Sequence, residues 1–257
     1  MNPEGGLETT LVIPCHDEAR RLNTSSFLDL LDASPELRLH FVDDGSTDNT
    51  ARALRHLRTQ AHPRVYVTTL EHNQGKAEAV RHGMLAALSE GARVVGYLDA
   101  DLATPVDEVV RLIMTFADRD VDVLLAARVA LLGRSIERSA TRHYLGRVFA
   151  SAASLALGLQ VYDTQCGAKL FRRIPALPTA LSEPFLSRWC FDVELLGRLL
   201  IGAPDVPPLQ PSRFLEEPLQ AWRDVPGSKL DVASKARALF DLGRVYRDLE
   251  RRRRAFG

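Results

Sequence analysis

The 257-residue chain has no excess charge of either sign, because its 33 lysines and arginines balance 33 aspartates and glutamates. Proteins that bind nucleic acid in bulk usually carry a strongly basic domain, so this balance argues against a nucleic-acid partner. There are only three cysteines, and their spacing fits neither a disulfide framework nor a zinc site. We therefore expect a reducing compartment, with a cytoplasmic location.

Long hydrophobic runs are also missing. The longest, VFASAASLALGL at residues 148–159, falls well short of the roughly 20 residues that cross a bilayer. The opening residues, MNPEGGLETTLVIP, lack the basic start and apolar run of a signal peptide. The chain is predicted to be soluble, or peripheral on the cytoplasmic face of a membrane, and not integral.

What the sequence does contain is an alternation of strand and helix patterns. Helical patterns separate five predicted strands, which lie at residues 10–13, 37–42, 65–70, 94–98 and 121–127. This alternation predicts an α/β fold with a parallel sheet covered by helices on both faces. In such sheets, ligands bind at the carboxyl ends of the strands. Polar clusters follow three of the predicted strands, so the binding site is expected there.

The sharpest cluster is Asp99-Ala100-Asp101, directly after the apolar run VVGYL. Two carboxylates one residue apart can share one hard divalent cation, Mg²⁺ or Mn²⁺, through their oxygens. The alternative is that both acids only cap the turn before a helix starting near Pro105.

Two further clusters favour a nucleotide. In VDDGSTD, the paired Asp43 and Asp44 can accept hydrogen bonds from a base or a ribose, although an Asx-type turn explains much of this segment. In HNQGK, Gly75 permits close backbone approach and Lys76 opens a helix, but the spacing is not that of a Walker loop. An ordinary helix entry explains HNQGK equally well.

A fourth cluster is FDVE at residues 191–194. Asp192 or Glu194 could act as a general base. Both could instead be first-turn acids that interact favourably with a helix dipole.

Together, LVIPCHDE, FVDDGSTDNT, HNQGKAEAVRHGM, YLDADLATP, DTQCGAKLF and RWCFDVELL resemble the motifs of family 2 glycosyltransferases, in the family's order. The last two, with GSKL at residues 227–230, are similar to the dolichyl-phosphate β-glucosyltransferase branch. The resemblance implies a GT-A domain over residues 1–228. Within it, residues 9–127 form a Rossmann-like nucleotide-sugar-binding half and residues 128–228 an acceptor half. A basic amphipathic helix over residues 229–257 follows.

The resemblance also implies roles for individual residues on the donor side. The residues that match the family's nucleotide-sugar site are Pro14, Glu18, Asp43, Asp44, Lys76, Asp99 and Asp101. Asp99 and Asp101 match the metal-binding acids, and the metal would neutralise charge on the departing nucleoside diphosphate, which gives Asp101 a catalytic part. His16 and Asp17 depart from the family's usual Tyr and Asn.

On the acceptor side, an acceptor phosphate would suit Arg128, Arg138 or Arg142, because guanidinium groups pair with phosphate bidentately. Some of these arginines could instead be solvated. Gln165 lies in the segment matching the acceptor half. Family enzymes invert the anomeric carbon by direct displacement. A phosphate acceptor then needs little base catalysis, whereas a hydroxyl acceptor needs a base, for which Asp192 and Glu194 are the candidates.

The expected reaction is therefore transfer of a hexose, with UDP-glucose as the preferred donor, to a polyprenyl phosphate. One alternative is a soluble transferase that glycosylates a hydroxyl of a small molecule. Another is a non-catalytic nucleotide-sugar-binding protein.

Charge is segregated toward the C-terminus, where residues 229–257 carry a net charge of +5 against −5 for the rest. This region, with the helix predicted at residues 144–159, could dock on an anionic membrane surface. Alternatively, it packs on the domain and leaves only residues 251–254 free.

Overall fold

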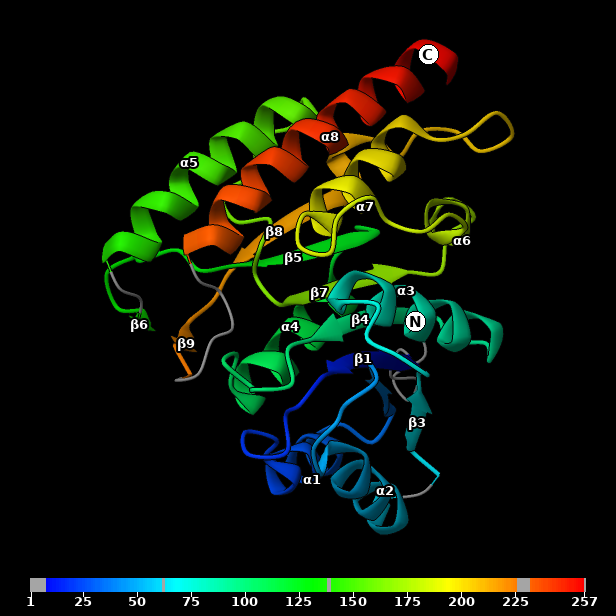
Figure 1. Ribbon diagram of the computed structural model, residues 1–257, viewed down its shortest axis with the longest axis vertical. Coiled ribbons are helices and arrows are strands. Elements are labelled where there is room, and N and C mark those ends of the chain that lie inside the picture. Colours follow the sequence, from blue (N-terminus) through cyan, green and yellow to red (C-terminus); the bar gives the residue numbers. More distant parts are fainter. Residues whose placement is uncertain (1–7, 62, 138–139, 226–231, 257) are drawn as a thin grey trace.

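The computed structural model describes residues 8–61, 63–137, 140–225 and 232–256 (Figure 1). Its strands are β1 (Thr9–Cys15), β2 (Leu37–Asp43), β3 (Val65–Thr69), β4 (Val94–Leu98), β5 (Val123–Ala127), β6 (Ser135–Glu137), β7 (Ala168–Arg172), β8 (Phe214–Pro218) and β9 (Ala221–Arg223). Its α-helices are α1 (Thr24–Ala33), α2 (Thr50–Ala61), α3 (Lys76–Ser89), α4 (Val106–Asp118), α5 (Ala140–Leu157), α6 (Ala176–Leu181), α7 (Phe191–Ile201) and α8 (Val232–Phe256).

A seven-stranded sheet in the order β3-β2-β1-β4-β7-β5-β8 forms the centre of the fold. The pairs β1–β2, β2–β3, β1–β4 and β5–β8 are parallel, whereas β7 is antiparallel to both of its neighbours. The predicted mostly parallel sheet is confirmed. A separate parallel pair, β6 and β9, lies beyond it.

The reversed strand β7 matters for the position of the site. Its first residue, Ala168, pairs with Leu98, the last residue of β4. The segment leading into β7 therefore arrives at the sheet edge where β1, β2, β4 and β5 end. Residues 163–167, far away in sequence, are thereby brought to the edge at which parallel sheets bind ligands.

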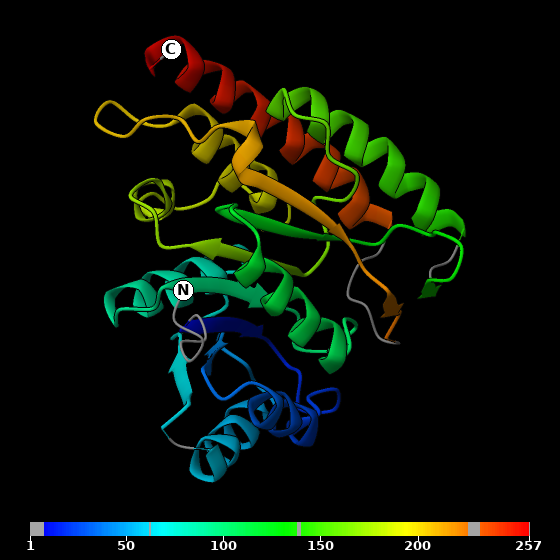
Figure 2. The same cartoon turned by 180° about the vertical axis from the view of Figure 1, so that it is seen from behind.

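Helices cover both faces of the sheet, as predicted, and each face has its own apolar core (Figures 1 and 2). Alternation along β1 shows the division: Leu11 and Ile13 pack with Phe27 of α1, while Val12 packs with Val80 of α3 on the other face. Helices α1, α2 and α4 cover the first face, and α3, α5, α6, α7 and α8 the second.

The sequence pattern after β1 predicts a helix over residues 18–31, but α1 begins only at Thr24. The side chain of Asn23 accepts a hydrogen bond from the Ser26 N–H and caps the helix there. Residues 18–22 instead form a turn in which the Glu18 carbonyl accepts from the N–H groups of Arg21 and Leu22. This early turn keeps Glu18 and Arg21 beside the strand ends.

The C-terminal helix α8 packs on the domain through Leu242, Val245 and Leu249, which are buried. Gly197 of α7 permits this contact, since a Cβ there would lie 2.4 Å from Leu249 Cδ1. The apolar face of α8 is thus intramolecular, as the second interpretation of the tail expected. Among the described helices, none combines the length and apolar character that a membrane crossing requires.

Close contact between β4 and β7 predicts a large penalty at Gly96, where an added Cβ would lie 2.3 Å from the Lys169 carbonyl oxygen. Gly96→Ala is expected to lower the free energy of unfolding by about 1–3 kcal/mol through overpacking. Gly243→Ala is the control, because a Cβ added there would meet no atom within 4 Å and alanine favours a helix by about 1 kcal/mol over glycine. Urea denaturation that ranks Gly96→Ala at or above wild type would contradict the tight β4–β7 contact.

Candidate active site

The turn after β4 places the two acids of the Asp99-Ala100-Asp101 motif at the sheet edge. The Asp99 carboxylate accepts from Lys76 Nζ at 2.5 Å, and its N–H donates to the Gly167 carbonyl at 3.0 Å. A Cβ added at Gly167 would lie 1.8 Å from Asp99 Oδ2, so any other residue there would displace this carboxylate. Residues from α3, β4 and the segment before β7 therefore meet around one carboxylate.

Asp101 lies in the same tight turn, in which Leu102 takes a left-handed conformation with φ of 50°. The Oδ1 atom of Asp101 accepts from the Ala103 N–H at 3.2 Å, and its Oδ2 atom lies 3.7 Å from Arg21 Nη1. Burial and the neighbouring Asp99 charge raise the pKa of Asp101. A bound cation would relieve this repulsion.

The acid pair fits a divalent metal. Both side chains are accessible, with Asp99 37% and Asp101 23% exposed, and both supply the oxygen ligands that Mg²⁺ and Mn²⁺ take. Within the residues that the structure describes, no group of three His, Cys, Asp or Glu side chains gathers. Remaining ligands would come from water and a substrate, as is usual for magnesium at phosphate sites.

Glu18 is buried beside this turn and is not free to bind a ligand with both oxygens. Arg21 Nη2 donates to its Oε1 at 2.5 Å and Nε to its Oε2 at 2.8 Å. Glu18 thereby aims the third nitrogen of Arg21 toward Asp101. Pro14 sits within β1, one residue before that strand ends.

Asp43 and Asp44, adjacent in sequence, have different contacts. Asp43 Oδ1 accepts from the Ser46 N–H at 3.0 Å, while its buried Oδ2 has no hydrogen-bond partner among the described residues. The Asp44 oxygens accept from the N–H groups of Gln74 and Gly75, each at 2.7 Å. Asp44 therefore holds the HNQGK loop in place, whereas Asp43 Oδ2 can accept a hydrogen bond from a ligand.

The unusual Asp17 also has a structural explanation. It takes a left-handed conformation, φ 50°, which Asp tolerates better than most residues. Its Oδ1 accepts from the N–H groups of Thr47 at 2.8 Å and Asp48 at 3.3 Å, and these bonds lower the pKa of Asp17. His16 Nδ1 lies 3.0 Å from the Asp44 carbonyl oxygen. His16 and Asp17, which both depart from the family pattern, therefore join the loop after β1 to the loop after β2.

Sequence reasoning missed Lys169, the second residue of β7, which is 1% exposed. Its Nζ lies 2.8 Å from Asp192 Oδ1, donates to the Cys166 carbonyl at 2.7 Å, and lies 5.2 Å from the centre of the Tyr97 ring. A lysine inside the apolar run AKLF is the signal that could have identified it. A buried lysine needs a charged partner, and its partner is Asp192.

The two carboxylate oxygens of Asp192 differ in their contacts, since within the described part of the chain Oδ1 has two close partners and Oδ2 has one distant partner. Tyr97 Oη donates to Oδ1, the same oxygen that faces Lys169. Burial and the Asp192 charge raise the pKa of Tyr97 well above its ordinary value, so the phenol remains a donor. Among the described residues, Oδ2 receives only a long hydrogen bond, 3.4 Å, from Gln165 Nε2. Gln165 thus lies beside Asp192.

The structure separates Glu194 from Asp192. Two residues apart on α7, they point to opposite sides of the helix. Glu194 is fully buried, with Arg198 Nη2 at 2.6 Å from Oε1 and the Leu186 N–H donating to Oε2 at 2.9 Å. Burial raises its pKa, which the Arg198 charge opposes. Of the two candidate bases, only Asp192 lies with the site.

Arg128 is committed to Asp163, with Nε at 2.6 Å and Nη2 at 2.8 Å from its two carboxylate oxygens. Its guanidinium also lies 5.3 Å from the Trp222 ring centre. Burial works against the charge, but Asp163 outweighs it and raises the pKa of Arg128. Arg128 therefore orders the segment before β7. Arg138 lies outside the described residues, as does the side chain of Arg142 on α5.

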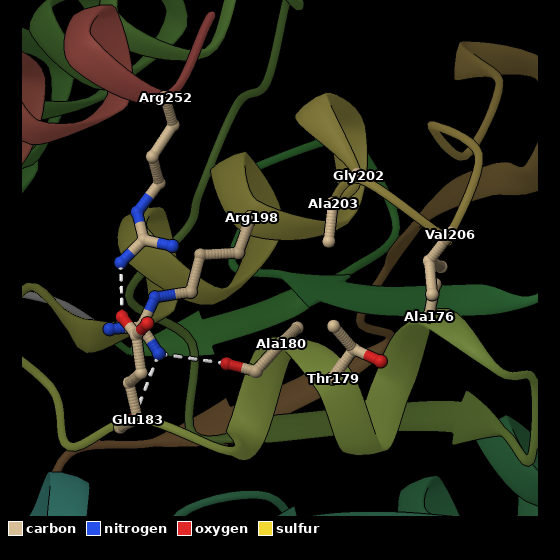
Figure 3. Close-up of a pocket in the computed structure, with 9 residues that line it drawn as sticks. All are labelled: Ala176, Thr179, Ala180, Glu183, Arg198, Gly202, Ala203, Val206 and Arg252. Carbon is tan, nitrogen blue, oxygen red and sulfur yellow. Dashed lines mark hydrogen bonds and ion pairs between the residues drawn. The ribbon is translucent and has the colours of Figure 1, made fainter. Parts of the chain in front are cut away.

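A small cavity between α6 and α7 lies away from these residues (Figure 3). Its volume is about 20 Å³, room for little more than one water, and Arg198 and Arg252 line it. Arg252 pairs with Glu183, and Arg198 Nη1 donates to the Ala180 carbonyl. The cavity belongs to helix packing and cannot hold a nucleotide sugar.

The Lys169–Asp192 pair gives a stability prediction. Lys169→Met leaves a buried, uncompensated carboxylate, so the free energy of unfolding should fall by about 3–5 kcal/mol. Lys169→Met/Asp192→Asn removes both charges and should recover much of that loss. Chemical denaturation of both variants measures the coupling. Additive effects of the two substitutions would show that the pair does not interact.

Comparison of the sequence with known proteins identifies the family of this chain. The profile described as "Glycosyl transferase family 2" matches residues 10–176. Dolichyl-phosphate beta-glucosyltransferase of Mus musculus is 31% identical over 238 residues, which are 87% of this chain and 69% of the relative. Its counterpart in Drosophila melanogaster is 32% identical over 241 residues, 87% of this chain and 69% of the relative.

Among solved structures, glucosyl-3-phosphoglycerate synthase from Mycobacterium tuberculosis, in complex with Mn²⁺, uridine diphosphate and phosphoglyceric acid, superposes with a TM-score of 0.65. The match covers 94% of this chain and 79% of that chain at 19% identity, so the likeness is one of fold. The predicted GT-A fold is confirmed. The chain therefore belongs to glycosyltransferase family 2, near its dolichyl-phosphate β-glucosyltransferase branch, and is a nucleotide-sugar-dependent glycosyltransferase.

Proposed function

We propose that the enzyme transfers glucose from UDP-glucose to the phosphate of a polyprenyl phosphate, with inversion at the anomeric carbon and with Mg²⁺ or Mn²⁺. The observation that carries the proposal is the meeting, at one sheet edge, of the Asp99–Asp101 turn with the segment that precedes β7. Curated relatives over nearly the whole chain are dolichyl-phosphate glucosyltransferases, which supports this donor sugar and acceptor.

On the donor side, Asp43 Oδ2 supports a nucleoside. A buried carboxylate oxygen without a partner costs free energy unless a ligand donates to it. The N–H of a uracil base is a donor of the required kind. Fold neighbours were solved with UDP and with UDP-glucose, in agreement with a uridine nucleotide.

Asp99 and Asp101 would hold the metal, which when bound neutralises charge on the leaving diphosphate. Lys76, whose Nζ contacts Asp99, adds a second positive charge beside that group. The neighbouring Asp99 and Asp192 charges outweigh burial and raise the pKa of Lys76, so it stays protonated. The chain thus supplies fixed positive charge where negative charge develops, which is the form of stabilisation that needs least reorganisation.

In the transfer itself, an acceptor phosphate oxygen forms a bond to the anomeric carbon as the bond from that carbon to UDP breaks. An ionised phosphate brings its own electron pair and needs no base. The Lys169–Asp192 pair then serves to hold the acceptor half in place. Two exposed leucines, Leu131 and Leu132, follow Arg128 on the loop from β5 to β6 and suit an apolar chain. A lipid acceptor places the enzyme at a membrane surface, which we assign to the cytoplasmic face.

One observation favours a second candidate. Asp192 presents Oδ2 with only a 3.4 Å hydrogen bond from Gln165, as a general base would. In a soluble enzyme acting on a hydroxyl, Asp192 would take the proton that the hydroxyl loses. A non-catalytic sugar-binding role receives no such support.

The first experiment measures release of UDP from UDP-glucose and Mn²⁺, with and without a short-chain polyprenyl phosphate. Release should depend on the lipid, and Asp101→Ala should lower it by about 100- to 1,000-fold through lost charge stabilisation. Asp107→Ala, an exposed acid in the first turn of α4, is the matched control and should retain activity. Slow metal-dependent hydrolysis without any lipid stimulation would instead point to a soluble acceptor.

Asp192→Asn separates the two candidates. With a phosphate acceptor, kcat should stay within about 10-fold of wild type, because no proton is removed from the nucleophile. With a hydroxyl acceptor, it should fall by about 100-fold or more. Lys169→Met/Asp192→Asn is measured beside it, since its buried charges are balanced. A collapse of lipid-dependent activity in both variants would show that Asp192 is required for transfer to phosphate.

A further inference from the structure

One face of α8 carries a row of exposed arginines with few contacts to the rest of the fold. Arg244 lies 3.8 Å from Asp241, and Arg247 donates to the Gly243 carbonyl at 3.3 Å. Arg244, Arg247, Arg251 and Arg254 are spaced by three, four and three residues, so they lie on one side of the helix within an arc of about 80°. Phe240 begins the same row and is 67% exposed. We call this row, with Phe240, the α8 outer stripe.

The outer stripe lies opposite the buried face. Leu242, Val245 and Leu249 pack against the domain, and each stripe position is about half a turn away from them. All four arginines are exposed. The stripe extends for about 21 Å along the helix axis, at 1.5 Å per residue. It therefore faces away from the protein along this part of α8.

Acids near the stripe are already paired. Asp248 accepts from Arg252 at 2.8 Å and Glu250 from Arg253 at 2.5 Å. Asp241 accepts from Ser187 at 2.9 Å and is 3.8 Å from Arg244, a distance that gives a weak ion pair. Among the described residues, Arg251 and Arg254 have no acidic partner. The stripe is thus a local excess of positive charge on a chain that is neutral overall.

Helix α5 packs beside α8 in the same outer layer of the fold (Figures 1 and 2). Its sequence, ATRHYLGRVFASAASLAL, contains no acid. On its exposed side, Val148 is 60% and Leu155 77% exposed, opposite the buried Ala153. Large apolar side chains beside uncompensated arginines are typical of helices that lie in a membrane interface.

We propose that the α8 outer stripe, together with Val148 and Leu155 of α5, docks the enzyme on an anionic bilayer surface. The arginines contact lipid phosphates and anionic headgroups, and the apolar side chains enter the boundary between headgroups and acyl chains. The buried face of α8 stays packed on the domain, so docking needs no unfolding of the helix. This inference deepens the proposed use of a lipid acceptor, but it concerns binding alone and can be tested without substrate.

The test is flotation of the full chain with two kinds of vesicle, one of phosphatidylcholine alone and one that also contains about 30 mol% phosphatidylserine. Phosphatidylserine makes the vesicle surface anionic enough to attract basic segments. Wild-type protein should float with the anionic vesicles and detach in high salt, since screening weakens surface charge. Changing Arg244, Arg247, Arg251 and Arg254 to Gln should weaken binding by about fivefold per arginine, or roughly 600-fold for the four together.

The matched control removes four other exposed arginines, namely Arg52, Arg55 and Arg58 of α2 and Arg119 after α4. It changes the net charge by the same amount and should leave binding close to wild type. Val148→Ser/Leu155→Ser should weaken binding to anionic vesicles and increase its sensitivity to salt. Thermal melts and release of UDP with a short-chain soluble acceptor show whether each variant is folded and active, so failed docking is distinguishable from failed catalysis.

Equal flotation of the stripe variant and wild type would overturn the proposal, as would equal loss in the α2 control. Wild-type binding to phosphatidylcholine alone would also contradict it. Tighter binding to single-stranded DNA than to anionic vesicles would assign the stripe to a different polyanion.

Discussion

Two carboxylates at the sheet edge, those of Asp99 and Asp192, each lie against a lysine. Lys76 contacts Asp99 at 2.5 Å, and Lys169 contacts Asp192 at 2.8 Å. The two Nζ atoms lie 5.9 and 5.2 Å from the centre of the Tyr97 ring. Removing Lys169 would leave a buried charge without a partner, which costs several kcal/mol. The lysines come from α3 and β7, so this charge balance requires both elements to meet at the sheet edge. A reversed β7 between β4 and β5 is what makes the meeting possible.

The sequence predicted the parts of the site that follow parallel strands. Asp43 ends β2, and Asp99 and Asp101 lie within three residues of the end of β4. The rule that parallel strands end at a common edge places them together. The same rule failed to place residues from the acceptor half, since it says nothing of an antiparallel strand. The register of Ala168 with Leu98 and the hydrogen bond from Asp99 to Gly167 show that the segment before β7 arrives there.

Other roles depend on contacts that no local pattern contains. Asp44 looks like a ligand residue, yet both oxygens bind the backbone of a loop 30 residues later. Asp192 and Glu194 look equivalent as first-turn acids, but the helix turns one toward Lys169 and the other toward Arg198. The sequence shows that the C-terminal region is basic. Which side of α8 packs on α7, and which side leaves its arginines exposed, is seen only in the structure. Sequence patterns locate polar groups, and packing decides which of them remain available.

The proposed function requires the donor diphosphate and the metal ion to meet at the Asp99–Asp101 turn. Anomalous scattering from crystals grown with Mn²⁺ and UDP tests this most directly, because it locates the ion without assuming a reaction. The account predicts a manganese peak within coordination distance of both carboxylates, roughly 2–2.5 Å, and adjacent to the UDP phosphates. Ordered UDP with manganese bound elsewhere, or with no manganese near either carboxylate, would contradict it.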